Sequence, residues 1–224
     1  MSSVLALGLT ACSSRPQGEG TTAESTTAES TTAENTTFAG SSTLVVYFSM
    51  PETTSTDESS MTEEERNSTV TINGETLGNT QYVAYVIQET TGADLFRIEP
   101  ETPYPVDHDT LIDLAAEEQD SNARPAIKDQ IENFEQYDTV FVGYPNWWHT
   151  APMIIGTFLE NYDLTGVDIY PFTQSASMNA EQFENSMDFV RENAPGANVH
   201  DGLFAHATDT EEIDGYLAEN GLAE

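Results

Sequence analysis

The side chains that could do chemistry in this chain are gathered in three short segments of polar and aromatic residues. Pro145–Thr150 (PNWWHT) holds both tryptophans of the chain next to a histidine. Leu77–Thr80 (LGNT) and Thr173–Ser177 (TQSAS) supply hydroxyl and amide groups. Indole rings can stack on a flat conjugated ligand, while hydroxyl, amide and backbone N–H groups can hold a phosphate. These residue types favour binding of a ligand over covalent catalysis.

Residues that would indicate other kinds of site are few. The chain has no Gly-x-Ser-x-Gly segment and no evident acid–base pair, so hydrolytic catalysis is not expected. The single cysteine, Cys12, excludes an internal disulfide and a cysteine-based metal cluster. The four histidines lack the spacing of metal ligands: His108, His149, His200 and His206. We therefore expect neither a catalytic residue nor a bound metal.

The charge of the chain limits its partners. It contains 6 Lys and Arg residues against 39 Asp and Glu residues, which gives a formal net charge of −33. Nucleic-acid binding requires a basic patch, so a nucleic-acid partner is excluded. The acidity has two open interpretations. It favours solubility and salt tolerance, or it creates a field that disfavours negative charge on a bound group and steers basic partners.

The three segments must be positioned by secondary structure, and the apolar pattern predicts an alternation of strands and helices. Strands are expected at 42–49, 93–100, 137–145, 166–172 and 197–207. Helices are expected at 77–92, 107–120, 151–161, 178–193 and 209–219. The Asn73-Gly74 pair predicts a hairpin within 68–77, whereas 51–67 shows no periodicity. Five strand–helix alternations predict a three-layer α/β domain with a parallel sheet covered on both faces.

In such a sheet, ligands bind beyond the carboxyl ends of the strands. Ser49 ends the first strand, Pro145–Thr150 follows the third and Thr173–Ser177 follows the fourth, while Leu77–Thr80 opens the first long helix. The start of that helix offers free N–H groups to a phosphate, although Gly78 to Thr80 also suit simple helix capping. One or both indoles could instead fill space under the next helix. His149 could reach the ligand or serve only at a helix start.

The segments LVVYFS…LGNT, VFVGYPNWWHTAP and PFTQSAS resemble bacterial flavodoxin-like domains with a Tyr-Pro-x-Trp-Trp loop. The resemblance covers about residues 43–205 and implies a five-stranded sheet of order 2-1-3-4-5 that binds one FMN without a covalent bond. It assigns the cofactor-binding residues by position. They are Ser49, Gly78, Asn79, Thr80, Pro145, Asn146, Trp147, Trp148, His149, Thr173, Gln174, Ser175 and Ser177.

The sequence departs from the family pattern in two places. Met50–Thr76 stands where two or three residues are usual, so the phosphate loop is split by an insertion. The third loop contains no glycine, although the family usually has glycines there that permit unusual backbone conformations. The expected function is FMN-dependent electron transfer, as a low-potential carrier or a reductase, with an unidentified redox partner. The alternative is a flavodoxin-fold binding or scaffold module that has lost flavin.

The first residues resemble the end of a bacterial lipoprotein signal, with Leu9-Thr10-Ala11-Cys12 as the lipobox, although no basic region precedes it. The resemblance implies a lipid on Cys12 that anchors the protein outside the cytoplasm. A chance match in a disordered leader is the other interpretation. Residues 13–41 contain the repeat TTAES and predict a disordered Thr- and Glu-rich linker. The expected organisation is thus 1–12 signal remnant, 13–41 linker and 42–224 flavodoxin-like domain.

Overall fold

The computed structural model describes residues 35, 41–51, 53, 55–176 and 179–223, all of which belong to one compact unit, Ala33–Glu224. Cys12, the lipobox and most of the predicted linker lie outside the described residues, as does Ser177. No helix among the described residues is long and apolar enough to cross a membrane.

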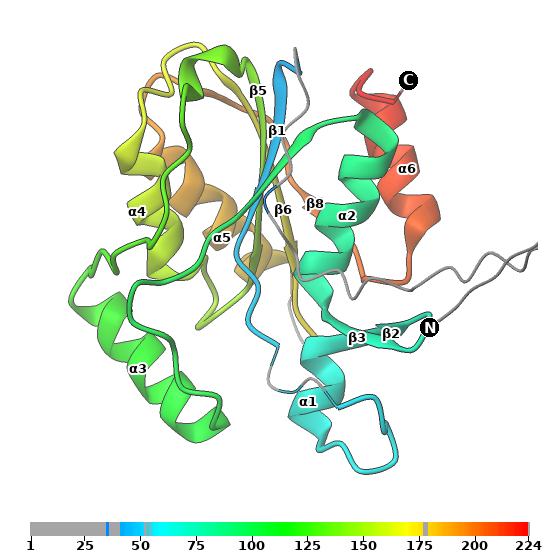
Figure 1. Ribbon diagram of the computed structural model, residues 1–224. Coiled ribbons are helices and arrows are strands. Elements are labelled where there is room, and N and C mark those ends of the chain that lie inside the picture. Colours follow the sequence, from blue (N-terminus) through cyan, green and yellow to red (C-terminus); the bar gives the residue numbers. More distant parts are fainter. Residues whose placement is uncertain (1–34, 36–40, 52, 54, 177–178, 224) are drawn as a thin grey trace, which may run out of the picture. The chain divides into compact units, whose positions relative to one another are not determined.

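A parallel sheet forms the centre of this unit (Figure 1). Its strands are β1 (Thr43–Tyr47), β4 (Asp94–Arg97), β5 (Thr139–Pro145), β6 (Asp168–Gln174) and β7 (Asn198–Val199). They lie in the order β4-β1-β5-β6-β7, which is 2-1-3-4-5 when these five are counted along the chain. The predicted fold class and strand order are therefore confirmed.

The predicted fifth strand, 197–207, forms two short strands instead of one. β7 pairs with Asp168 and Ile169 of β6, and β8 (Leu203–Phe204) pairs further along, with Phe172 and Thr173. Between them the chain leaves the sheet at Gly202, where an added Cβ would lie 2.2 Å from the sulfur of Met187. The backbone at Gly202 thus lies close to the helix that carries Met187.

Helices cover both faces of the sheet (Figure 1). On one side lie α2 (Asn79–Thr91) and α6 (Thr210–Glu219), and on the other lie α3 (His108–Asp120), α4 (Met153–Asn161) and α5 (Ala180–Asn193). All five agree with the predicted helices to within two residues at each end. A short 3₁₀ helix, Phe134–Gln136, precedes β5.

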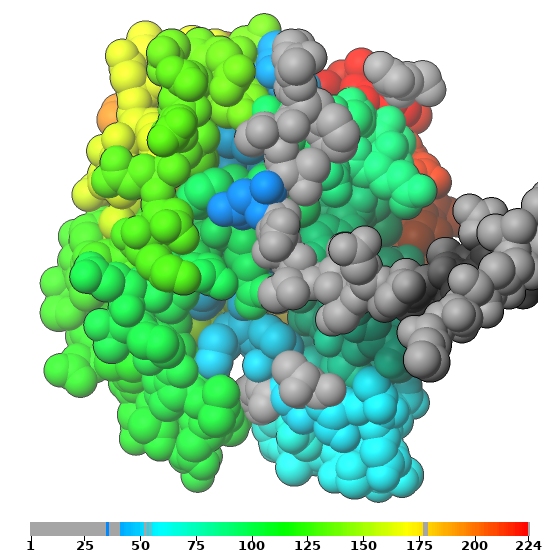
Figure 2. Space-filling model, viewed as in Figure 1, coloured from blue at the N-terminus to red at the C-terminus, as the bar shows by residue number. Residues whose placement is uncertain are grey.

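The insertion after β1 has its own secondary structure. The predicted hairpin is confirmed as β2 (Thr69–Ile72) and β3 (Glu75–Gly78), with Asn73 and Gly74 at positive φ in the turn. A short helix that we did not predict, α1 (Glu63–Ser68), precedes it. In Figure 2 the cyan atoms of α1 and the green atoms of α3 stand on either side of a hollow at the carboxyl edge of the sheet.

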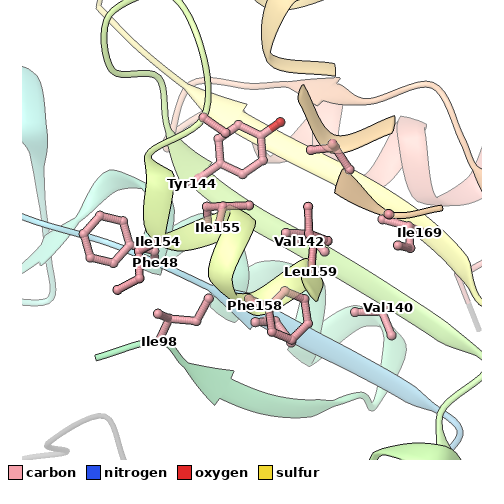
Figure 3. Packing of buried hydrophobic residues seen from close by; sticks show 14 of the residues in the cluster. Phe48, Ile98, Val140, Val142, Tyr144, Ile154, Ile155, Phe158, Leu159 and Ile169 are labelled. Atoms are coloured by element: carbon pink, nitrogen blue, oxygen red, sulfur yellow. The ribbon is translucent and has the colours of Figure 1, made fainter. Parts of the chain in front are cut away.

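The two faces of the sheet have separate apolar cores, as the alternation of side chains in β1 shows. Leu44 and Val46 face the core under α4, whereas Val45 and Tyr47 face the core under α2 and α6. Figure 3 shows the first core, where side chains of β5 meet the apolar side of α4. This packing fixes the ends of β1, β5 and β6, from which the loops at the carboxyl edge emerge.

Candidate functional site

Two adjoining cavities lie at the carboxyl edge of the sheet. The first, here called the α2 cavity, has a volume of about 230 Å³ and reaches the start of α2. The second, here called the tryptophan cavity, has a volume of about 320 Å³ and extends between α3 and the Trp147–Trp148 loop. Side chains that line both are His108, Leu111, Asn146, Trp147 and Ser175. Ligand pockets commonly hold roughly 300–1,000 Å³, so the two cavities together suit a ligand larger than a single ring system.

The structure brings the three predicted segments together at these cavities. Of the residues predicted to bind a cofactor, those in the α2 cavity are Ser49, Asn79, Thr80, Pro145, Asn146, Trp147, Gln174 and Ser175. Trp148 and His149 line the tryptophan cavity. Gly78 and Thr173 line neither of them. Residues as far apart in the sequence as Ser49 and Ser175 thus form one site.

The start of α2 leaves room for other groups to lie close to its backbone. Asn79 and Thr80 are buried in the first turn, and Gly78 before them supplies no side-chain cap. An added Cβ on Gly78 would lie 2.1 Å from Ser49 Oγ, so only glycine lets the hydroxyl of Ser49 pack against this turn. The N–H groups and the positive end of the helix dipole favour a negative group here.

The insertion forms the opposite wall of the α2 cavity, through Glu64, Asn67 and Ser68. The amide of Asn79 donates a hydrogen bond to the backbone oxygen of Asn67 at 2.7 Å, which joins the insertion to α2. The pKa of Glu64 is lowered by hydrogen bonds from its own backbone N–H and from the Thr62 side chain. The sequence prediction missed these residues, although Thr62 and Glu65 form a capping box that marks a helix start.

The Trp147–Thr150 segment is a tight turn. Trp147 N–H donates to Thr150 O at 2.9 Å, and Thr150 N–H donates back to Trp147 O at 3.1 Å. The two central residues, Trp148 and His149, have φ of 48° and 67°. Asparagine and glycine usually occupy such positions, because other side chains make positive φ unfavourable. The loop therefore stores backbone strain at the cavity rim.

The two indoles have different surroundings. Trp147 is half-buried, and its ring contacts Phe48 and Tyr104 edge to face, at centroid distances of 5.4 and 5.3 Å. Trp148 is 48% exposed, and its Nε1–H donates to the backbone oxygen of Ile112 in α3 at 2.7 Å. Trp147 thus belongs partly to the core and partly to the site, whereas Trp148 stands on the surface of α3.

The third loop is tied to the second. Asn146 N–H donates to Gln174 O at 3.1 Å, and the Asn146 amide donates to the backbone oxygen of Gln182 in α5 at 3.4 Å. Thr173 is buried within β6, and its hydroxyl makes no hydrogen bond within the described residues. Of this glycine-free segment, Gln174, Ser175 and Ala176 reach the α2 cavity.

Helix α3 supplies the remaining wall, which the sequence prediction also missed. His108, Leu111, Ile112 and Ala115 line the tryptophan cavity. Asp107 caps the helix, and hydrogen bonds from the Thr110 hydroxyl and N–H lower its pKa. The sequence placed Asp107–Asp109 at a helix start, which is confirmed, but the periodicity could not show that α3 leans over the ligand edge. Among the described residues, no group of His, Cys, Asp or Glu is arranged to hold a metal ion.

Residues 71–220 match the family model described as Flavodoxin. A crystal structure from Bacteroides eggerthii, assigned as a flavoprotein, is 30% identical, with 79% of this chain and 96% of that chain covered and a TM-score of 0.61. A second, from Bacteroides uniformis, is 25% identical, with 80% and 99% covered and a TM-score of 0.60. A flavoprotein from Lactobacillus acidophilus in complex with FMN is 22% identical, with 77% and 97% covered and a TM-score of 0.52. No curated protein sequence matches this chain.

Proposed function

The chain belongs to the flavodoxin family, and from this premise we propose that it binds FMN and transfers electrons with it, as a carrier or a reductase. One observation carries the proposal: the loops after β1, β5 and β6 converge on one cavity, with a helix start at one end and Trp147 at the other. The Lactobacillus acidophilus flavoprotein, which shares the fold, is in complex with FMN.

The residues present fit FMN. At one end of the α2 cavity, Ser49, Asn79 and Thr80 surround the start of α2, where the missing Cβ of Gly78 leaves room for Ser49. These neutral donors would hold the phosphate. At the other end, Trp147 offers an aromatic surface, and Asn146, Gln174 and Ser175 offer polar groups to the flavin edge.

FMN, when bound, supplies the electron-transfer chemistry, and the protein supplies binding, orientation and electrostatics. Leu111 and Trp147 add apolar side chains to the lining of the site, while the hydrogen bonds of Asn146 fix the second loop against the third loop and against α5. Glu64 places a negative charge in the wall of the α2 cavity, because a glutamate side chain is ionised near neutral pH.

The alternative proposal, a flavodoxin-fold module without flavin, is favoured by the glycine-free Thr173–Ser177 segment. Colour separates the two proposals. The full chain is purified, titrated with FMN and followed by visible absorbance and by flavin fluorescence. We expect a yellow protein that quenches FMN fluorescence, and Ser49→Ala should bind less tightly. A colourless protein that leaves FMN fluorescence unchanged would refute the flavin proposal.

A carrier and a reductase differ in whether the protein oxidises NAD(P)H in repeated cycles. The sequence contains no Gly-x-Gly-x-x-Gly dinucleotide fingerprint, which favours a carrier that receives electrons from a protein partner. Steady oxidation of NAD(P)H by the FMN-loaded protein with a small electron acceptor would assign it as a reductase. A protein that is reduced by dithionite but does not oxidise NAD(P)H would be assigned as a carrier.

We also propose that Cys12 carries a lipid that anchors the protein to the outer face of the bacterial cell membrane. The support is the lipobox Leu9–Cys12 and the Thr- and Glu-rich repeat that follows it. Cells that express the full chain are extracted with a detergent that separates into two phases. The wild type should enter the detergent phase and Cys12→Ala the aqueous phase. Equal distribution of both proteins would contradict the anchor.

A further inference from the structure

Strand β4 ends the sheet on one side, so some of its backbone hydrogen-bonding groups point away from the other strands. Directly after it, Ile98 N–H donates to Tyr47 O of β1 at 2.8 Å. Successive N–H groups of a strand point to opposite sides, so the N–H of Arg97 points outward. An outward edge of this kind is a place where another strand can add to a sheet.

Two other parts of the chain contact this outer edge. Just beyond β4, the segment 126–128 makes two backbone hydrogen bonds with Glu99 and Glu101, at 2.9 and 2.8 Å. Within β4, Arg97 N–H donates to the side-chain oxygen Oδ1 of Asn35 at 2.8 Å. Asn35 therefore takes the place that a carbonyl oxygen of a neighbouring strand would take.

Asn35 is also the residue at which the repeat of the linker changes. The sequence reads TTAES at 21–25 and again at 26–30, but TTAEN at 31–35. Asparagine carries its side-chain oxygen one bond farther from the backbone than serine does. A serine at the same backbone position would therefore not reach Arg97. The repeat thus departs from its pattern at the residue that contacts the sheet.

This contact lies at the carboxyl edge of the sheet. Arg97 is the last residue of β4, and its guanidinium donates to the backbone oxygen of Ser49, which lines the α2 cavity, at 3.4 Å. Thr43 is the first residue of β1 and lies at the other end of the strands. Since β1 and β4 are parallel and Tyr47 pairs with Arg97, the chain passes from the carboxyl edge at Asn35 to the amino edge at Thr43.

We propose that Asn35 docks the end of the linker on the outer edge of β4, so that the residues before it leave the domain at the carboxyl edge of the sheet. The docked segment occupies an edge to which a second protein molecule could otherwise add a strand. It also orients an anchored domain, because a lipid on Cys12 would then tether the edge that carries the α2 cavity. This last consequence rests on the proposed anchor, whereas the docking itself is tested without lipid or FMN.

Hydrogen exchange of single backbone amides, followed by NMR on the full chain without FMN, tests the contact. Arg97 N–H should exchange about tenfold faster in Asn35→Ser than in the wild type, because one hydrogen bond is lost. Ile98 N–H, which is bonded to β1, should exchange at the same rate in both proteins. Ser30→Ala changes the same position of the preceding repeat and is the matched control, in which both amides should exchange as in the wild type. Unchanged exchange of Arg97 in Asn35→Ser, or equal acceleration of Ile98, would overturn the docking.

The direction in which the linker leaves the domain is tested with a nitroxide label on Glu34→Cys, in a chain that also carries Cys12→Ser. The label should broaden the NMR signal of Arg97, at the carboxyl end of β4, more than that of Ala93 before its other end. Adding Asn35→Ser should remove most of this difference. Equal broadening of the two signals in the chain that retains Asn35, or stronger broadening of Ala93, would overturn the proposed exit.

Discussion

Trp147 and Trp148 are neighbours in the sequence but contribute to different properties of the molecule. Trp147 packs edge to face against Phe48 and Tyr104, whereas Trp148 lies about half exposed on α3. Truncation of a half-buried tryptophan removes both apolar contacts and aromatic pairs. We therefore expect Trp147→Ala to lower the free energy of unfolding by about 2–4 kcal/mol.

Urea unfolding of the full chain without added FMN measures this loss. Trp148→Ala is the comparison, and it should lower stability by less than about 1 kcal/mol, because most surface substitutions have small effects. Equal losses in the two variants would show that Trp148 packs as firmly as Trp147. The contrast assigns the two indoles, which the sequence alone left open.

His149 occupies a backbone conformation that suits glycine. Its φ of 67° is left-handed, and a non-glycine residue in a sparsely populated region costs of order 1–3 kcal/mol. Glycine removes this strain but loses about 0.5–1 kcal/mol more conformational entropy on folding. His149→Gly is thus expected to raise the free energy of unfolding by about 1 kcal/mol. His149→Ala, measured in the same urea series, should not, and a matching increase in the alanine variant would contradict the strain argument.

The sequence could place these residues but not describe their conformation. Pro145–Thr150 was predicted as a loop at the ligand edge because it follows an apolar strand, and it is one. The tight turn was not foreseen, since Trp-His carries none of the Asn-Gly signal that normally marks one. Thr173 was predicted to face the ligand, but β6 continues through it and buries its hydroxyl. Such details depend on where a strand ends, which periodicity locates poorly.

At the scale of elements, the prediction succeeded where apolar residues repeat. The buried runs of β1, β5 and β6 and the apolar sides of the five long helices were all visible in the sequence. Helix α1 was missed because it buries none of its residues and therefore shows no apolar side. The predicted last strand is interrupted near Gly202, whose backbone lies close to Met187 of α5. Long-range contacts of this kind leave no local signal.

The start of α2 depends on one glycine. A Cβ at position 78 would meet Ser49 Oγ at 2.1 Å, and the Ser49 Cβ and a Pro51 carbon only at 3.4 Å. The least costly relief is rotation of the Ser49 side chain, which would turn its hydroxyl away from its present position. If that hydroxyl holds the FMN phosphate, Gly78→Ala should weaken FMN binding about as much as Ser49→Ala does, roughly tenfold for a lost hydrogen bond to a charged group.

Fluorescence titration with FMN of both single variants and of the double variant tests this coupling. The double variant should bind no more weakly than either single variant, because both changes remove the same hydroxyl. Additive losses would mean that Gly78 acts on FMN independently of Ser49. Riboflavin, which lacks the phosphate, serves as the control ligand, and its affinity should be similar in all four proteins.

At the scale of the whole molecule, the most unusual property is its charge. The chain has a net charge of −33. The described residues that line the α2 cavity include no Lys or Arg, and they include Glu64. Phosphate recognition in this chain would therefore rely on neutral donors and a helix start, against the field of the protein. The usual dependence of anion binding on salt, in which added salt weakens attraction to cations, should be reversed.

We expect FMN affinity to increase several-fold when sodium chloride is raised from about 20 mM to about 500 mM, because the screening length falls well below the size of the protein. Riboflavin should show little change over the same range, since it carries no phosphate charge for the acidic surface to repel. Fluorescence titrations of both ligands at constant pH measure the difference. In Glu64→Gln, the salt effect on FMN should be smaller, because one carboxylate is removed from the cavity wall. A decrease in FMN affinity with salt would show instead that a cation of the protein holds the phosphate.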